Sequence, residues 1–125
     1  MDTATSVLVV DDEPQVVWML RFSLDAEGYQ TLSARDGRAA LEEIREHRPD
    51  VVLLDIMMPV MDGWSVLEEL RSVPLEERPR VIVLSARASL RDRAKAAELG
   101  ADAFVPKPFN VDDLLRILHG LQRAS

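Results

Sequence analysis

The sequence predicts an α/β domain in which helices cover both faces of a parallel sheet. Three short apolar runs rich in β-branched residues, Val7–Val10, Val51–Leu54 and Val81–Leu84, are bounded by polar residues, as strands buried on both faces are. Helical patterns separate these runs, and such alternation is typical of right-handed βαβ units. The 125 residues, 47% of them hydrophobic, suffice for one core and are too few for two ordinary domains.

Two weaker segments complete the predicted sheet. Tyr29–Ser33 alternates in polarity, which favours an edge strand, and Ala103–Val105 is expected to be a fifth strand. Five strands then alternate with five helices along residues 1–125, and the whole chain is expected to form one unit.

The first predicted helix lies between two residues that suit helix ends. Pro14 fits the first helical turn, where its missing N–H costs nothing, and Gly28 fits the left-handed position after the last turn. The face expected to be buried carries Val16, Leu20 and Leu24. A helical wheel places Trp18 and Phe22 on the opposite side, where we expect them to be exposed.

The other four helices also have recognisable ends. The second is expected to begin near Asp36 and stop before Pro49, the third to follow Gly63, the fourth to end at Gly100, and the fifth to be capped by Asn110. The apolar residues expected to anchor the last three helices are Val66, Leu67 and Leu70, then Leu90, Ala94 and Ala97, then Val111, Leu114, Leu115 and Leu118.

Composition excludes several classes of function. Acidic residues outnumber basic ones 22 to 15, and the net charge of −7 disfavours binding to nucleic acid or anionic membrane. The chain has no cysteine, which excludes disulfides, thiol catalysis and Cys-ligated zinc. It shows neither a targeting segment nor a run long enough to span a bilayer, so we expect a cytoplasmic domain.

Most of the candidate functional side chains directly follow the predicted strands. Asp11 and Asp12 follow the first strand, Asp55 the third, Ser85 the fourth and Lys107 the fifth. In an open α/β sheet ligands bind beyond the carboxyl ends of the strands, so these side chains are expected to converge. Each alone has an ordinary explanation, since surface carboxylates are usually solvated, strand-ending Asp residues form turns and Ser caps helices. Their convergence favours a site.

Three carboxylates at one sheet edge repel each other and favour a hard cation with oxygen ligands. Mg²⁺ suits this set, because it accepts a few carboxylates and keeps several waters, whereas Ca²⁺ prefers more protein oxygens. A metal beside an aspartate indicates phosphoryl transfer with Asp55 as nucleophile. Lys107 and the Ser85 hydroxyl would then contact the phosphoryl oxygens.

Four segments, VLVVDDEP, VVLLDIMMPVMDG, VIVLSA and FVPKPF, resemble in their order and spacing the receiver domain of two-component response regulators across essentially the whole chain. The resemblance implies a doubly wound, flavodoxin-like sheet of order 2-1-3-4-5 with five helices. It also implies a phosphorylation-controlled switch that catalyses its own phosphorylation and slow dephosphorylation. An effector domain could follow Ser125, or the domain could stand alone.

The resemblance also assigns roles to individual residues. Asp11 and Asp12 would be the metal acids, Asp55 the phosphoacceptor, the Met57 backbone carbonyl a further Mg²⁺ ligand, Lys107 the phosphoryl-binding cation, and Ser85 and Phe104 the switch residues. The donor would be a phosphohistidine on a sensor histidine kinase or a histidine phosphotransfer protein. Phosphorylation would reshape the surface of the fourth helix, fifth strand and fifth helix for a downstream protein or a second copy of the chain.

Some positions vary within the family pattern or depart from it. Pro106 directly before Lys107 is unusual and removes a backbone donor near the end of the fifth strand. A cis Lys107–Pro108 bond is expected from the resemblance alone. Met57 and Arg87 occupy positions that tune hydrolysis of the acyl phosphate in the family.

Three other functions compete with this interpretation. An aspartyl-phosphate phosphatase shares the nucleophile and the metal, but it usually has a second acid two residues after the first, where this chain has Met57. A flavodoxin-like cofactor binder needs a Ser/Thr/Gly-rich phosphate loop that the sequence lacks. A receiver-shaped interaction domain that never accepts phosphate is disfavoured by the full set of acids and the lysine.

Other polar residues suggest no site. His47 and His119 lie far apart without clustered partners, so we interpret them as helix-surface residues. Arg91, Arg93 and Lys95 are expected to form the solvated face of the fourth helix.

Overall fold

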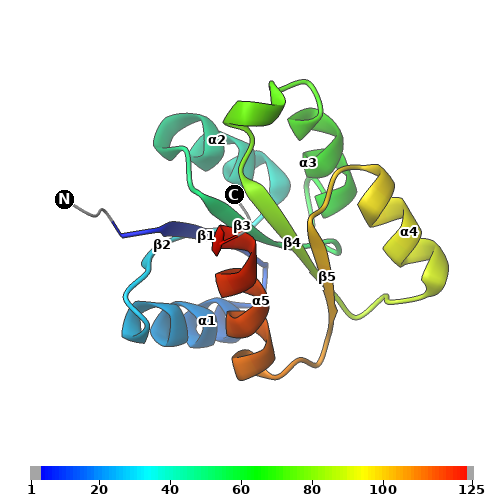
Figure 1. Cartoon of the computed structure of the whole chain (residues 1–125). Helices are drawn as coiled ribbons and strands as arrows, with labels where there is room; N and C mark the ends of the chain where they lie inside the picture. The colour runs from blue at the N-terminus through cyan, green and yellow to red at the C-terminus, as the bar shows by residue number, and fades with distance from the viewer. Residues whose placement is uncertain (1–3, 124–125) are drawn as a thin grey trace.

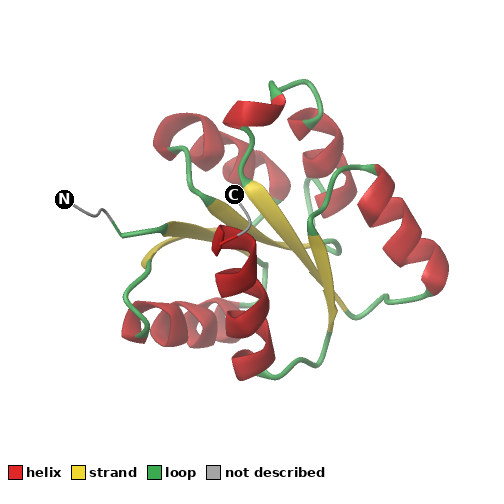
Figure 2. Ribbon diagram, in the orientation of Figure 1, coloured by secondary structure: helices red, strands yellow, loops and turns green. Residues whose placement is uncertain are grey.

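The computed structural model describes residues 4–123 and contains five parallel strands in one sheet with helices on both faces (Figures 1 and 2). The strands are β1 (Ser6–Val10), β2 (Gln30–Ala34), β3 (Val51–Asp55), β4 (Arg80–Ser85) and β5 (Ala103–Pro106). Their order is β2-β1-β3-β4-β5, which confirms the doubly wound topology expected from the resemblance. The edge position predicted for the second strand is also confirmed, although the strand begins at Gln30 rather than Tyr29.

Helices follow the strands as the sequence predicts. They are α1 (Pro14–Ala26), α2 (Gly37–His47), α3 (Gly63–Leu70), α4 (Leu90–Glu98) and α5 (Val111–Arg123). A short 3₁₀ helix, η1 (Leu75–Glu77), lies between α3 and β4 and was not expected. No helix within residues 4–123 is long and apolar enough to cross a membrane.

Each central strand contributes to two cores, because successive side chains point to opposite faces of the sheet. In β1, Val7 and Val9 pack toward α1 and α5, whereas Leu8 and Val10 pack toward α2, α3 and α4. The same alternation runs through β3 and β4. Figure 1 shows the two layers, with α1 and α5 on one side of the sheet and α2, α3 and α4 on the other.

The predicted helix ends are confirmed by capping contacts. The side chains of Asp36, Asp62 and Asn110 accept hydrogen bonds from backbone N–H groups in the first turns of α2, α3 and α5. Gly28 and Gly100 have φ values of +92° and +99°, the left-handed conformation that glycine adopts without strain at a helix end. These caps fix where the helices begin and end relative to the strands.

The prediction for the buried face of α4 was wrong. Leu90 is 87% exposed, and Ala94 and Ala97 also face solvent. The side chains that turn inward are Asp92 and Ala96, followed by Leu99 just beyond the helix. The period is helical as predicted, but the phase differs, because Ser89 caps the helix and pairs with Asp92, which rotates Asp92 toward the protein.

Candidate metal site at the carboxyl ends of the strands

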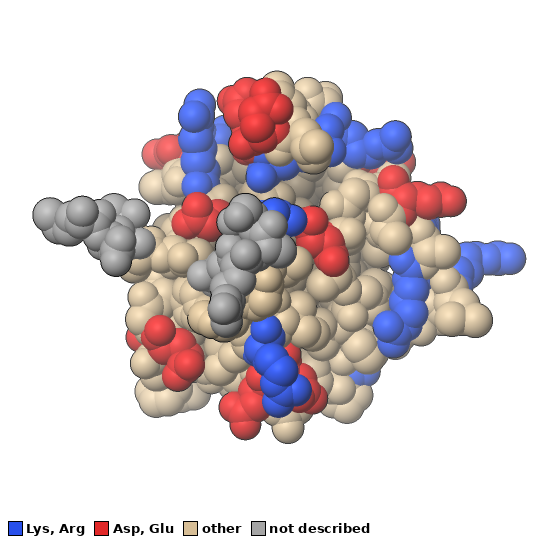
Figure 3. All heavy atoms as spheres, viewed as in Figure 1, with Lys and Arg blue, Asp and Glu red and all other residues tan. Residues whose placement is uncertain are grey.

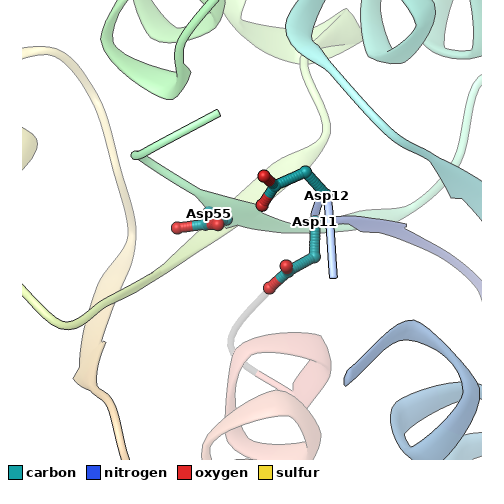
Figure 4. A group of neighbouring side chains, drawn as sticks. All are labelled: Asp11, Asp12 and Asp55. Carbon is teal, nitrogen blue, oxygen red and sulfur yellow. The ribbon is translucent and has the colours of Figure 1, made fainter. Parts of the chain in front are cut away.

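Parallel pairing brings the predicted acids together. Val10 of β1 lies opposite Leu54 of β3, so the residues that come next in each strand meet at the same edge of the sheet. Figure 4 shows Asp11 and Asp12 leaving the end of β1 toward opposite sides, with Asp55 at the end of the neighbouring β3. One carboxylate oxygen from each of the three lies within 4.8 Å of the others. Asp11 and Asp55 are buried, and Asp12 is exposed.

Backbone contacts orient the two buried carboxylates. Asp11 Oδ1 accepts a hydrogen bond of 2.9 Å from the Glu13 N–H, and Asp55 Oδ1 accepts one of 3.2 Å from the Met57 N–H. Each of these acids therefore has one oxygen engaged by the loop that follows it and a second oxygen directed elsewhere. That second oxygen faces Lys107 in both cases.

Lys107 follows the edge strand β5 and reaches the acids across the end of β4. Its backbone N–H donates to the Ser85 carbonyl at 2.8 Å, and the bond between Lys107 and Pro108 is cis, as the resemblance implied. The Lys107 ammonium Nζ lies 2.7 Å from Asp11 Oδ2, 3.6 Å from Asp55 Oδ2 and 3.9 Å from Glu13 Oε1. Although burial disfavours the charged form, these carboxylates, Asp11 foremost, raise the pKa of Lys107 above its usual value.

The electrostatics single out Asp55 among the acids. Burial, together with repulsion from Asp11, raises the pKa of Asp55 from 3.8 to about 6, while Lys107 and the Met57 N–H oppose the shift. The carboxylate thus remains mainly ionised at neutral pH but carries a cost of desolvation that a cation or an added ligand can relieve. A carboxylate that is ionised but poorly solvated suits a residue whose bound cation or ligand changes during function.

Ser85 and Phe104 lie on the adjacent strands β4 and β5. Ser85 ends β4 and is fully buried, and its Oγ accepts a hydrogen bond of 3.0 Å from the Arg87 N–H. It does not cap a helix, since Ser89 fills that role for α4. Phe104 is half-buried, and the Arg93 guanidinium carbon lies 5.1 Å from the centroid of its ring.

Two close backbone approaches hold the loop after β3 in place. A Cβ on Gly63 would lie 2.5 Å from the Asp55 carbonyl oxygen, and one on Gly37 would lie 2.5 Å from the Met61 carbonyl oxygen. Both glycines also donate backbone hydrogen bonds into this loop, to Ile56 and Met61. Only glycine allows α2 and α3 to start so near the end of β3, so these positions help to fix Asp55.

The residues present fit a hard divalent cation. Carboxylate oxygens are the ligands that Mg²⁺ prefers, and the exposure of Asp12 would leave room for the waters that a bound Mg²⁺ keeps. Three carboxylates, Asp11, Asp55 and Glu13, face the Lys107 ammonium, and Asp12 adds a fourth negative charge to the cluster, which leaves it strongly negative. The Met57 carbonyl, expected as a further ligand, belongs to the same residue whose N–H donates to Asp55.

The structure also contains contacts near the site that were not expected from the sequence. Arg87 pairs with the buried Asp92 at 3.7 Å, and Asp92 accepts a hydrogen bond of 2.7 Å from the Ser89 hydroxyl. The spacing of Ser89 and Asp92 is that of a capping box, a signal in the sequence that could have revealed this contact. Nothing in the sequence pattern indicates that Arg93 lies over Phe104. The histidines agree with the surface interpretation, since His47 pairs with Glu43 on α2 and His119 is exposed.

The exposure expected for the aromatic pair of α1 is confirmed. Trp18 and Phe22 are 68% and 64% exposed, and their rings stack with centroids 5.3 Å apart. They line a groove of about 460 Å³ together with Asp11 and Asp12. Arg21, which lines the same groove, donates hydrogen bonds to Thr31 and Ser33 and thereby holds α1 against β2. The groove is therefore continuous with the acidic site.

Relatives in sequence are regulatory proteins. The chain is 45% identical over 121 residues to the transcriptional regulatory protein KdpE of Mycobacterium tuberculosis, covering 97% of this chain and 52% of that protein. It is 44% identical over 119 residues to the response regulator MprA of Mycolicibacterium vanbaalenii, covering 95% of this chain and 51% of that protein. The chain thus spans about half the length of the curated relatives it matches.

Solved structures of response regulators have the same fold. The Francisella response regulator 1452 receiver domain superposes with a TM-score of 0.87 at 33% identity, covering 97% of this chain and 99% of that one. The Vibrio cholerae chemotaxis response regulator CheY4 superposes with a TM-score of 0.86 at 32% identity, covering 94% and 98%. A family model for the response regulator receiver domain matches residues 7–119. The chain therefore belongs to the receiver domain family of two-component response regulators.

Proposed function

We propose that this domain is a phosphorylation-controlled switch that accepts a phosphoryl group on Asp55 from a phosphohistidine donor. The observation that carries the proposal is the setting of Asp55, a buried carboxylate with a raised pKa, 3.6 Å from the Lys107 ammonium and clustered with two further acids. Residues 1–125 would act as one receiver unit, alone or within a longer regulator, in the cytoplasm.

The transfer is a displacement at phosphorus. An Asp55 carboxylate oxygen forms the new P–O bond, the P–N bond to the donor imidazole breaks, and the imidazole nitrogen keeps the electron pair and takes up a proton. With a pKa of about 6, Asp55 is largely ionised at pH 7 and needs no general base. The reaction consists mostly of positioning the partners and neutralising charge.

Lys107 and Ser85 would serve the phosphoryl oxygens. The ammonium of Lys107 already lies among the carboxylates and stays protonated because they raise its pKa. It could therefore pair with a negatively charged oxygen of the phosphoryl group on Asp55. The Ser85 hydroxyl, at the end of the strand next to β3, would donate a hydrogen bond to another phosphoryl oxygen.

Asp11, Asp12 and Asp55, with the Met57 carbonyl, would hold Mg²⁺. When bound, the ion supplies charge neutralisation at the phosphoryl oxygens and lowers the repulsion between donor and acceptor. Because Asp11 and Asp12 would be committed to the metal, only Asp55 would be modified. Autodephosphorylation would be slow hydrolysis of the same acyl phosphate, which makes the domain a switch rather than an enzyme that turns over a substrate.

The output of the switch would be a protein contact. Phosphorylation would draw Ser85 toward the phosphoryl group and turn Phe104 inward, altering the surface of α4, β5 and α5 for a downstream protein or a second copy of the chain. The donor would be a sensor histidine kinase or a histidine phosphotransfer protein. The net charge of −7 argues against nucleic acid as a partner of this domain itself.

The test is phosphorylation of purified variants with acetyl phosphate and with a phosphohistidine donor, read by intact-protein mass. We expect one phosphoryl group on the wild type when Mg²⁺ is present, none when it is chelated, and none on Asp55→Asn. Asp113→Asn, which removes an exposed carboxylate of α5, is the matched control and should be labelled normally. Labelling of Asp55→Asn equal to the wild type would refute the assignment.

A further inference from the structure

Helix α4 is anchored by unusually little apolar surface. Ala96 is its one buried apolar residue, and Leu99 adds to it just beyond the last turn. By contrast, α5 buries Leu114 and Leu118 completely. Because burial of apolar area is the main source of packing energy, α4 depends on other contacts for its position.

Two cations supply those contacts. The Arg93 guanidinium carbon lies 5.1 Å from the ring centroid of Phe104 on β5, and the Lys95 ammonium lies 4.3 Å from the ring centroid of Trp64 on α3. Both distances are within the range of cation–π attraction. Figure 3 shows basic side chains gathered over α4, at the right of the view. The helix is thus held on one side to the edge strand and on the other to its neighbouring helix.

A chain of polar contacts connects α4 to the site. The Arg87 N–H donates to Ser85 Oγ, the Arg87 guanidinium pairs with Asp92, and Asp92 accepts a hydrogen bond from Ser89 at the start of α4. The Arg93 guanidinium also donates to the Ala88 carbonyl in the same loop. The segment between β4 and α4 therefore cannot move without moving the first turn of the helix, which carries Arg93.

Recruitment of Ser85 to a phosphoryl group competes with this arrangement. If the Ser85 hydroxyl turns toward an anion on Asp55, the Arg87 N–H loses its buried acceptor and the loop has to rearrange to satisfy it. Such a rearrangement would shift α4 and separate Arg93 from Phe104. The contact between these two residues would then exist only while Asp55 carries no phosphoryl group.

We propose that Arg93 and Phe104 form a latch that holds α4 in its unphosphorylated position and thereby limits how readily Asp55 accepts a phosphoryl group, an inference that rests on the proposed function. A contact made in only one of two states stabilises that state and lowers the affinity of any ligand that requires the other. Removing the latch must therefore tighten binding of a phosphoryl mimic.

The direction of this effect separates the latch from simple electrostatics. Loss of a cation weakens the binding of an anion when only the field of the protein matters. The latch requires the opposite sign, namely tighter binding after a positive charge is removed. Arg91, on the same helix and without a recorded partner among the described residues, is the matched control for charge.

The experiment titrates each purified variant with beryllofluoride at fixed Mg²⁺ and follows α4 and the site by amide NMR. Arg93→Ala and Arg93→Met should half-saturate at concentrations roughly two- to fivefold lower than the wild type, the factor that corresponds to one partly exposed cation–π contact. Arg91→Ala should bind with wild-type affinity or slightly more weakly. Arg93→Met keeps the aliphatic cover of the ring, so it remains informative if Arg93→Ala loses stability.

A second comparison tests whether Arg93 acts through Phe104. In a Phe104→Leu background the ring is gone, so Arg93→Ala should no longer change beryllofluoride affinity. Unchanged or weaker binding by both Arg93 variants, or an equal effect of Arg93→Ala with and without Phe104, would overturn the latch. A wild type that binds no beryllofluoride with Mg²⁺ would instead refute the proposed function, so the two failures are distinguishable.

Discussion

Asp55 is a buried carboxylate, and the free energy of unfolding should depend on pH because of it. Its pKa rises from 3.8 in the unfolded chain to about 6 in the folded one, chiefly through burial and next through Asp11. Between these values the folded protein holds a proton that the unfolded chain has lost, so this residue's contribution to stability falls as pH rises from about 4 to about 6. Above pH 6 the full cost of the buried charge remains.

Asp55→Asn should therefore stabilise the metal-free protein at neutral pH. Amide replaces carboxylate at nearly the same volume and removes the repulsion from Asp11, and we expect a gain of up to about 3 kcal/mol at pH 7.5 that shrinks toward zero near pH 4. Urea unfolding at both pH values, in the presence of a chelator, measures the difference. Asp113→Asn serves as the exposed control. A gain of equal size at both pH values would contradict the role of the raised pKa.

Val60 adopts a conformation that its side chain disfavours. Its φ is +67°, and the Met61 N–H donates to the Pro59 carbonyl at 2.7 Å, which closes a three-residue γ-turn around it. A β-branched residue with positive φ is strained, and Val60 is 79% exposed, so little packing offsets the strain.

Val60→Gly should consequently stabilise the domain, by about 0.5–1 kcal/mol after allowance for the greater freedom of glycine in the unfolded chain. Thermal unfolding checks this. Val60→Ala is the comparison, since alanine retains a Cβ and should recover less. Destabilisation by glycine would mean that the Val60 side chain makes a contact worth more than the strain.

Helix α1 presents its aromatic pair beside the site, and this geometry favours a partner-binding role for the element. Trp18 and Phe22 stack on each other in solvent, and the groove they line reaches Asp11 and Asp12. Large exposed aromatics are the residues that most often anchor protein interfaces. The proposed phosphohistidine donor would approach Asp55 across this rim.

The double substitution Trp18→Ala and Phe22→Ala should slow transfer from a cognate phosphohistidine donor by about tenfold or more, as loss of an interface anchor does. Its melting temperature should barely change, because both rings are largely exposed. Labelling by acetyl phosphate should persist, since that donor has no helix to dock. Leu75→Ala removes an exposed apolar residue on η1 and should leave all three quantities unchanged. A large loss of stability with normal transfer would disprove the docking role.

At the scale of the molecule, the proposed cation site would link cation binding to folding. Asp11 and Asp12 follow β1 and Asp55 ends β3, and their carboxylates converge only in the folded state. A cation that binds the folded protein alone stabilises it by mass action.

Mg²⁺ should therefore raise the melting temperature in a concentration-dependent way, with a stabilisation of about 2.7 kcal/mol at a concentration one hundred times the dissociation constant. Asp12→Asn should lose most of this effect, because Asp12 is a proposed ligand and is exposed, so its replacement leaves the core intact. Asp113→Asn, with the same change of charge, should keep it. If calorimetry shows equal stabilisation of Asp12→Asn and the wild type, the cation binds elsewhere.

Much of this architecture is encoded locally. The β-branched runs predict strands because both faces of a central strand are apolar. Helix ends are indicated by Pro14, Asp36, Gly63 and Gly100, because few residue types suit the unpaired backbone groups and the left-handed conformation found there. The site acids could be predicted as a group because parallel strands place their carboxyl ends at one edge.

Contacts between elements were decided only by the tertiary structure. The phase of α4 depends on Ser89 pairing with Asp92, and the position of Arg93 over Phe104 depends on how α4 lies against β5. Likewise, the raised pKa of Asp55 comes from burial and from the charge of Asp11, and only strand pairing brings Asp11 and Asp55 together. Periodicity along a chain specifies which residues share a face. It does not specify what that face meets, because packing energy and desolvation arise from residues distant in sequence.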